Sequence, residues 1–79
     1  MKIRVTVLPK PSVLDPQGVA TAGAMKHLGW PGNPRVRVGK MIEIEAPGAT
    51  PDEEQLHAIC RDLLSNPVIE DYTIEFEDR

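Results

Sequence analysis

Eight prolines limit where regular secondary structure can form in this chain. They stand at positions 9, 11, 16, 31, 34, 47, 51 and 67 of the 79 residues. Proline lacks the backbone N–H that a helix interior or a central strand requires. The uninterrupted stretches between these positions are therefore the candidate helices and strands.

The stretch before Pro9 predicts a strand. Ile3, Val5 and Val7 alternate with polar residues, which is the pattern of a strand with one buried face. Pro9 and Pro11 end that pattern.

Asp15 followed by Pro16 predicts the start of a helix. The carboxylate can accept hydrogen bonds from the first free N–H groups, and proline at the first helical position loses no needed donor. Gly18 costs such a helix about 1 kcal/mol relative to alanine. Its presence predicts close approach by another backbone, a subunit or a ligand, with an incidental glycine as the alternative. Gly29 is the expected helix end, and the expected packing stripe is Thr21, Ala24, Met25 and Leu28.

Residues 35–45 alternate between apolar and polar types on both sides of Gly39-Lys40. Glycine suits the first position of a type II′ turn, so we favour a hairpin of two strands. The alternative is one long bent strand with a bulge at Gly39.

A second helix is predicted after Pro51. Thr50 and Glu53 have the spacing of a capping box, and Asn66-Pro67 ends the helix. The expected apolar stripe is Leu56, Ile59, Cys60, Leu63 and Leu64. In the final strand one face is expected to hold Val68, Tyr72, Ile74 and Phe76, opposed by Asp71, Thr73, Glu75 and Glu77.

This order of elements predicts a single α+β domain over residues 1–79, with the ferredoxin-like βαββαβ plan. Both helices would cover one face of an antiparallel sheet. The other face would be polar and charge-matched, either solvated or paired with a second copy. It would hold Lys2, Arg4, Thr6, Arg35, Arg37, Glu43, Glu45, Thr73, Glu75 and Glu77.

Charge is divided unequally along the chain, whose net charge is -3. Residues 1–40 contain seven basic residues and one acidic residue, whereas residues 41–79 contain two basic and eleven acidic residues. We expect complementary strands to meet within the fold or across an interface, rather than a nucleic-acid surface. A chain of this size has a thin core, which favours oligomerisation. The single cysteine and the lack of a long apolar run predict a soluble cytoplasmic protein without a membrane partner.

The sequence offers no constellation for catalysis. Cys60 lies in the apolar stripe, where an unreactive buried thiol is expected, and His57 precedes it by one helical turn without a third group to orient the pair. Neither histidine has the spacing of a zinc site. We therefore predict no catalytic residue and no metal site. Arg37 and Lys40 around Gly39 are the nearest approach to an anion site, with a solvated strand edge as the alternative.

Three runs of the sequence closely resemble the PurS family, the small subunits of phosphoribosylformylglycinamidine synthase. The runs are Val13–Gly18, Val36–Lys40 and Val68–Tyr72. The resemblance implies a non-catalytic subunit of a carbon–nitrogen ligase that acts in purine biosynthesis. It also implies a large subunit that uses ATP and magnesium, and a separate glutaminase subunit that releases ammonia from glutamine.

In that family this chain would form a homodimer or higher homo-oligomer, bind no cofactor itself, bridge the two larger subunits and aid ammonia transfer. The positions expected to contact a partner subunit are Asp15, Pro16, Gln17, Gly18, Arg37, Gly39 and Lys40. The alternative function is a free-standing ferredoxin-like regulatory module that binds a small ligand at a dimer interface.

Overall fold

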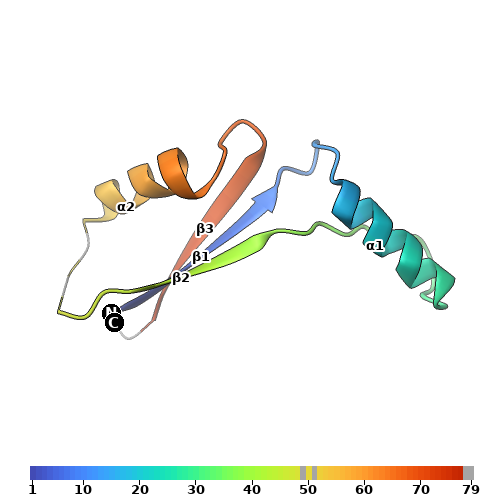
Figure 1. Ribbon diagram of the computed structural model, residues 1–79, viewed down its shortest axis with the longest axis horizontal. Helices are drawn as coiled ribbons and strands as arrows, with labels where there is room; N and C mark the ends of the chain where they lie inside the picture. Colours follow the sequence, from blue (N-terminus) through green and yellow to red (C-terminus); the bar gives the residue numbers. More distant parts are fainter. Residues whose placement is uncertain (49, 51, 78–79) are drawn as a thin grey trace.

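The computed structural model describes residues 1–48, 50 and 52–77, which form three strands and two helices (Figure 1). The strands are β1 (Lys2–Pro9), β2 (Lys40–Glu45) and β3 (Glu70–Glu77). The helices are α1 (Pro16–His27) and α2 (Glu53–Ile59), and α2 continues into η1 (Cys60–Leu64), a π-helical turn.

The sheet is antiparallel and β1 is its central strand, in the order β2-β1-β3. Ile3 lies opposite Ile44 of β2 and Phe76 of β3, so both neighbours present apolar residues on the same face as β1. The alternation predicted for β1 is confirmed. In β3 it is confirmed for Tyr72, Ile74 and Phe76, but Val68 precedes the strand and is 79% exposed, so its predicted place on the apolar face is wrong.

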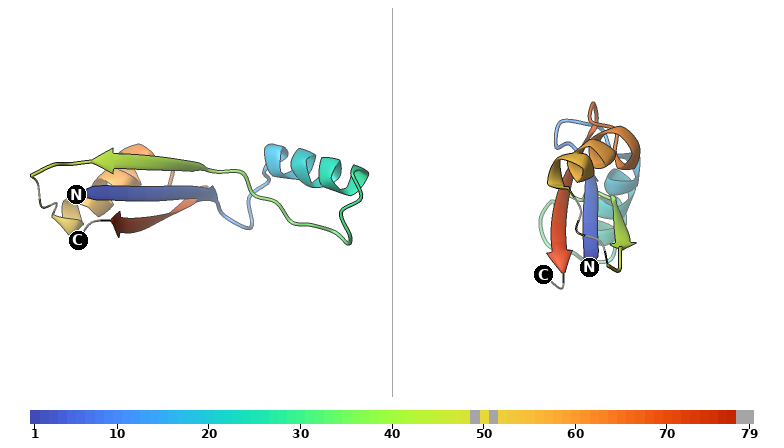
Figure 2. Two further views of the ribbon diagram at one scale, coloured as in Figure 1. Left: turned by 90° about the horizontal axis from the view of Figure 1, so that it is seen from below. Right: turned by 90° about the vertical axis from the view of Figure 1, so that its left-hand side faces the viewer.

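The core lies between this face and α2. Ile3, Val5 and Val7 are buried together with Leu56 and Cys60. Seven half-buried side chains surround them: Met1, Ile42, Ile44, Leu64, Tyr72, Ile74 and Phe76. Figure 2 shows α2 lying across one face of the sheet. Because the fully buried set is small, the stability of the domain depends on few side chains.

The predicted hairpin at Gly39-Lys40 is wrong. Among the described residues only Lys40–Glu45 pairs with β1 in this region, and residues 35–39 continue as extended chain toward α1. The alternative of one long extended segment is closer to the structure. Gly39 lies against the end of β1. A Cβ added at this position would stand only 2.1 Å from Val7 O. The glycine therefore serves a close approach of two backbones rather than a turn.

The expectation that both helices cover one face is also wrong in its placement of α1. This helix lies beyond the end of the sheet, which gives the molecule extents of 48 × 27 × 14 Å (Figures 1 and 2). The predicted packing stripe of α1 is not buried: Leu28 is 86% exposed, and Gly18 is the helix's buried residue. The sheet is too short to reach α1 because residues 35–39 do not extend it.

The second helix begins differently from the prediction. Its N-cap is Asp52, whose Oδ1 accepts a hydrogen bond from Glu54 N at 3.0 Å. The prediction of Thr50 as the N-cap of a capping box is therefore wrong. Pro51 lies outside the described residues. Leu56, Cys60 and Leu64 pack on the core, whereas Ile59 and Leu63 of the predicted stripe are exposed.

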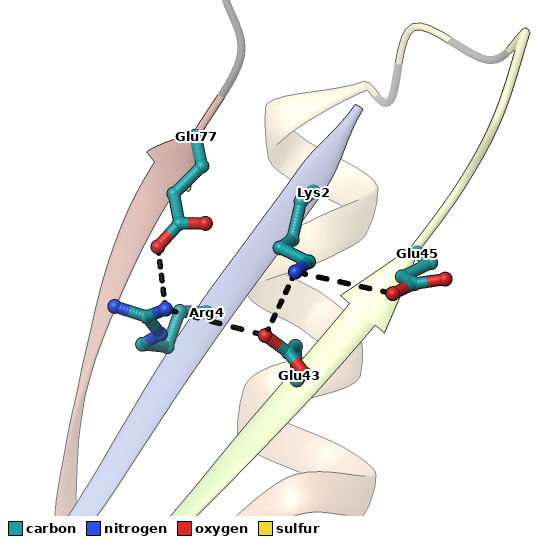
Figure 3. Close-up of polar contacts among 5 residues, drawn as sticks. All are labelled: Lys2, Arg4, Glu43, Glu45 and Glu77. Atoms are coloured by element: carbon teal, nitrogen blue, oxygen red, sulfur yellow. Dashed lines mark ion pairs between the residues drawn. The ribbon is translucent and has the colours of Figure 1, made fainter.

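The open face of the sheet carries ion pairs that join the basic β1 to its acidic neighbours (Figure 3). Lys2 Nζ lies 3.2 Å from Glu43 Oε1 and 3.9 Å from Glu45 Oε1, and Arg4 Nη2 lies 2.6 Å from Glu77 Oε1. The expected meeting of complementary strands is therefore confirmed within the fold. Such surface pairs contribute about 0–1 kcal/mol each.

The α+β class and the antiparallel sheet are confirmed, and the arrangement is consistent with the ferredoxin-like plan.

Candidate functional site

The structure brings together two of the three sequence runs singled out above. Asp15 Oδ2 accepts a hydrogen bond at 2.8 Å from Val38 N, and Gly18 packs against Val36. A Cβ added at Gly18 would lie 2.0 Å from Val36 O and 2.9 Å from its carbonyl carbon. We call residues 34–38 the strap, because this extended segment runs along the loop and the first turn of α1. The close approach predicted at Gly18 is thus made by the chain's own backbone.

Two arginines of the strap hold the loop that follows β1. Arg35 Nη2 donates a hydrogen bond to Pro11 O, and Arg37 Nη1 donates one to Pro9 O at 3.2 Å. These bonds join residues more than 20 positions apart in sequence. Arg35 and Arg37 do not lie on the open face of the sheet as predicted, because residues 35–39 form no strand.

A hollow of about 230 Å³ opens between the loop, the strap and α1. Its lining includes two strongly exposed apolar side chains, Leu14 at 78% and Val19 at 62% exposure. We call it the α1 pocket, and its lining residues are Pro11, Val13, Leu14, Asp15, Val19, Ala22, Pro34, Arg35, Val36 and Arg37. A half-open hollow with apolar walls and two guanidinium groups can hold an apolar group next to an anionic one.

The geometry favours the ionised form of Asp15. The hydrogen bond from Val38 N lowers the pKa of this carboxyl below its usual value, and the nearby N–H groups of Gly18 and Gln17 lower it further. The side chain nevertheless makes no capping hydrogen bond in the first turn. The sequence correctly predicts Asp15 at the N-cap position, but its carboxylate serves mainly to hold the strap.

Cys60 and His57 do not form a reactive pair. Burial raises the pKa of the Cys60 thiol, and the side chain has no exposed area. His57 is exposed, and its Nδ1 lies 2.8 Å from Tyr72 Oη on β3. Within residues 1–48, 50 and 52–77 no three His, Cys, Asp or Glu side chains gather as metal ligands. In the same part of the chain, no helix has the length and apolar character to cross a membrane.

Comparison with known proteins identifies the family. A family model described as PurS, phosphoribosylformylglycinamidine (FGAM) synthase, matches residues 2–78. The chain belongs to the PurS family. A PurS subunit of phosphoribosylformylglycinamidine synthase from Mycobacterium leprae is 45% identical over 75 residues, which cover 95% of this chain and 94% of that protein. The Synechocystis PurS subunit is also 45% identical, over 91% of this chain and 74% of that protein.

Solved PurS structures have the same fold. The Bacillus subtilis PurS structure superposes with a TM-score of 0.83 at 38% identity and covers 98% of each chain. The Methanocaldococcus jannaschii PurS structure gives a TM-score of 0.77 at 34% identity, over 99% of this chain and 96% of that one. The resemblance drawn from the three runs is confirmed, and it favours the PurS function over the free-standing regulatory module.

The partner-contact positions expected from PurS resemblance fall into two groups. Asp15, Pro16, Gln17, Gly18 and Arg37 lie around the strap and the first turn of α1. Gly39 and Lys40 lie apart from them at the start of β2, where Lys40 pairs with Val7. Their contact with a partner subunit stays a prediction.

Leu14 and Val19 are the pocket residues that the sequence reasoning missed. Leu14 stands inside the first PurS-like run, and Val19 follows it directly. Neither residue belongs to the predicted packing stripe of α1, and the sequence pattern gives no reason to expect a pocket beside them. The sequence signal for such a pocket is an apolar residue on each side of a helix start, in a helix that does not pack on the sheet.

We expect the stability of this PurS-family chain to depend on Asp15 at acidic pH. The folded-state pKa of Asp15 is lowered, so its stabilising effect is complete above the unfolded-state pKa near 3.8 and is lost as pH falls through the folded-state value. Asp15→Asn keeps an acceptor for Val38 N but removes the charge. Urea unfolding between about pH 2 and pH 7 should show a smaller loss of stability on acidification for the variant. An identical pH profile would contradict this assignment.

We expect Cys60 to resist alkylation in the folded protein. The thiol is buried and its pKa is raised, so little thiolate reaches a reagent at neutral pH. Labelling with iodoacetamide, followed by mass spectrometry, should be complete in denaturant and should proceed at least about 100-fold more slowly without it. Equal rates would show that the core opens readily.

Proposed function

We propose that this chain acts as the non-catalytic assembly subunit of phosphoribosylformylglycinamidine synthase. It bridges the synthase large subunit and the glutaminase subunit during the glutamine- and ATP-dependent amidation of formylglycinamide ribonucleotide, and it aids ammonia transfer. The observation that carries this proposal is the match to PurS over residues 2–78. The relatives that match nearly the whole chain are each named as PurS subunits of that synthase.

Exposed apolar side chains support a function inside an assembly. Large hydrophobic residues are exposed on α1 and on the loops beside it, although the core itself is small. Exposed apolar surface on a small protein is typical of an interaction site. The homodimer or higher homo-oligomer expected for this chain would cover part of that surface.

ATP, magnesium and glutamine belong to the other subunits in this proposal. We therefore assign no cofactor to this chain, and we expect it to work in the cytoplasm without a nucleic-acid or membrane partner.

Reconstitution tests the proposal. The large subunit and the glutaminase are mixed with and without this chain, and the synthase rate is measured with glutamine or with ammonium chloride as the nitrogen source. We expect the chain to raise the glutamine-dependent rate by about tenfold or more, since proximity of two sites has effects of at least this size. The ammonium-dependent rate should change little, because bulk ammonia needs no bridge. An unchanged glutamine-dependent rate would overturn the proposal.

A further inference from the structure

The division of charge along the sequence becomes a division along the long axis of the molecule. Residues 9–40, which form the α1 end, contain five basic residues and a single acidic one, Asp15. Figure 1 shows this part of the chain, from light blue to green, extending past the sheet on one side. The acidic residues of β2 and β3 lie on the sheet. Those of α2 lie toward the end of the molecule's long axis that is opposite to α1 (Figure 1).

Most of the positive charge of the α1 end is not neutralised internally. Among the described residues, Lys10 is the one of its five basic residues that pairs with a carboxylate, Asp71 Oδ1 at 3.8 Å. The one carboxylate, on Asp15, accepts its hydrogen bond from Val38 N and forms no ion pair among the described residues. Arg35 and Arg37 are exposed, and each donates to one proline carbonyl. A guanidinium carries five N–H donors, so these bonds position each arginine and leave donors for a carboxylate.

The α1 pocket lies between these arginines and the exposed Leu14 and Val19. Its volume of about 230 Å³ is below the range of about 300–1,000 Å³ that is typical of small-molecule sites. That size suits one apolar side chain of a protein partner. Arginine, which lines this pocket twice, is among the residues enriched in interface hot spots.

We propose that the α1 pocket docks a segment of another synthase subunit that carries an apolar side chain flanked by carboxylates. The apolar side chain packs between Leu14 and Val19, and the carboxylates pair with Arg35 and Arg37. This inference rests on the proposed function and deepens it, because it assigns the surface that meets a partner.

A second copy of this chain fits the pocket less well. On such a copy, the exposed Val68 and Ile69 are followed by two carboxylates, on Glu70 and Asp71. Both of those carboxylates already have partners within their own chain. Glu70 Oε1 accepts from Asn66 N at 2.7 Å, and Asp71 Oδ1 lies 3.8 Å from Lys10 Nζ.

Two matched leucines allow a direct test. Leu14 lines the α1 pocket and is 78% exposed, whereas Leu63 lies on η1 and is 75% exposed. Leu14→Asp and Leu63→Asp therefore make the same chemical change on two surfaces, with little effect expected on the core. Val19→Glu is the second pocket variant, and glutamate is the better helix former.

The full-length chain and each variant are titrated into the purified large subunit, the purified glutaminase and their mixture, and the affinity is measured by calorimetry. Leu14→Asp and Val19→Glu should weaken binding by about tenfold or more, as expected for loss of an interface anchor, while Leu63→Asp should stay within about twofold. Wild-type affinity should also fall between about 50 and 500 mM NaCl, because screening weakens the arginine–carboxylate pairs.

The failures of the two proposals are distinguishable. If the wild-type chain binds neither subunit nor their mixture, the proposed function fails and this inference fails with it. If the wild type binds and Leu14→Asp binds equally well, or if Leu63→Asp is the variant that loses affinity, the docking surface alone is overturned. A Leu14→Asp chain that keeps its partner affinity but changes its mass in solution would assign the pocket to a second copy.

Discussion

Gly18→Ala is expected to separate α1 from the strap. The added Cβ would meet Val36 O at 2.0 Å, and both close atoms of Val36 belong to the backbone, so the helix or the strap must move. Overpacking of this kind costs about 1–3 kcal/mol, which exceeds the gain of about 1 kcal/mol from alanine in a helix. Hydrogen exchange should show weaker protection of the α1 amides, with the amides of the central strand much less affected.

Gly23→Ala is the matched control for that experiment. Gly23 lies in the same helix, and an added Cβ there meets nothing within 4 Å. We expect this variant to stabilise α1 by up to about 1 kcal/mol, so the two alanine substitutions should have opposite signs. Wild-type protection of α1 in Gly18→Ala would contradict the contact with the strap. Because Gly18 serves this internal contact, any effect of its substitution on assembly should be accompanied by a loss of local stability.

Gly39→Ala is expected to lower the stability of the whole domain rather than of one end. An added Cβ would lie 2.1 Å from Val7 O and 2.7 Å from Leu8 Cδ2, directly beside the central strand. A cost of about 1–3 kcal/mol corresponds to a fall in Tm of about 4–8 °C for each kcal/mol in a domain of this size. Thermal unfolding followed by circular dichroism measures this change.

A second substitution at Gly39 tests the extended path of the chain at this position. In the predicted type II′ hairpin, glycine would be needed for a positive φ, whereas the structure has positive φ at Gly29, Gly32 and Gly48 and not at Gly39. Gly39→D-Ala separates the two cases, because a D-residue suits a type II′ turn. Rescue by D-alanine would support the turn and contradict the extended path.

The parts of the fold that the sequence predicted are those that depend on local pattern. Alternation in β1 and the 3.6-residue spacing of Leu56, Cys60 and Leu64 each identify one buried face, and both faces meet in the core. The position of α1 could not be predicted in the same way. Its apolar residues fit a helix that packs on a sheet, and only the length of the sheet decides whether it can.

The path of residues 35–45 was also ambiguous in the sequence. A glycine between two alternating segments is compatible with a turn, a bulge or a close approach of backbones, and the last of these depends on Val7, far away in sequence. The same reasoning applies to Asp15. Its identity as N-cap follows from the neighbouring proline, but its hydrogen bond to Val38 N depends on the tertiary fold.

The central position of β1 determines when the domain can form during synthesis. Lys2 of this strand pairs with Glu45 and with Glu77, so β1 depends on residues that are synthesised much later than itself. Contacts between such distant residues form slowly, and unpaired apolar strands are prone to aggregate. A nascent chain therefore exposes Ile3, Val5 and Val7 until β3 has left the ribosome. The core therefore forms only once β3 is available to pair with β1.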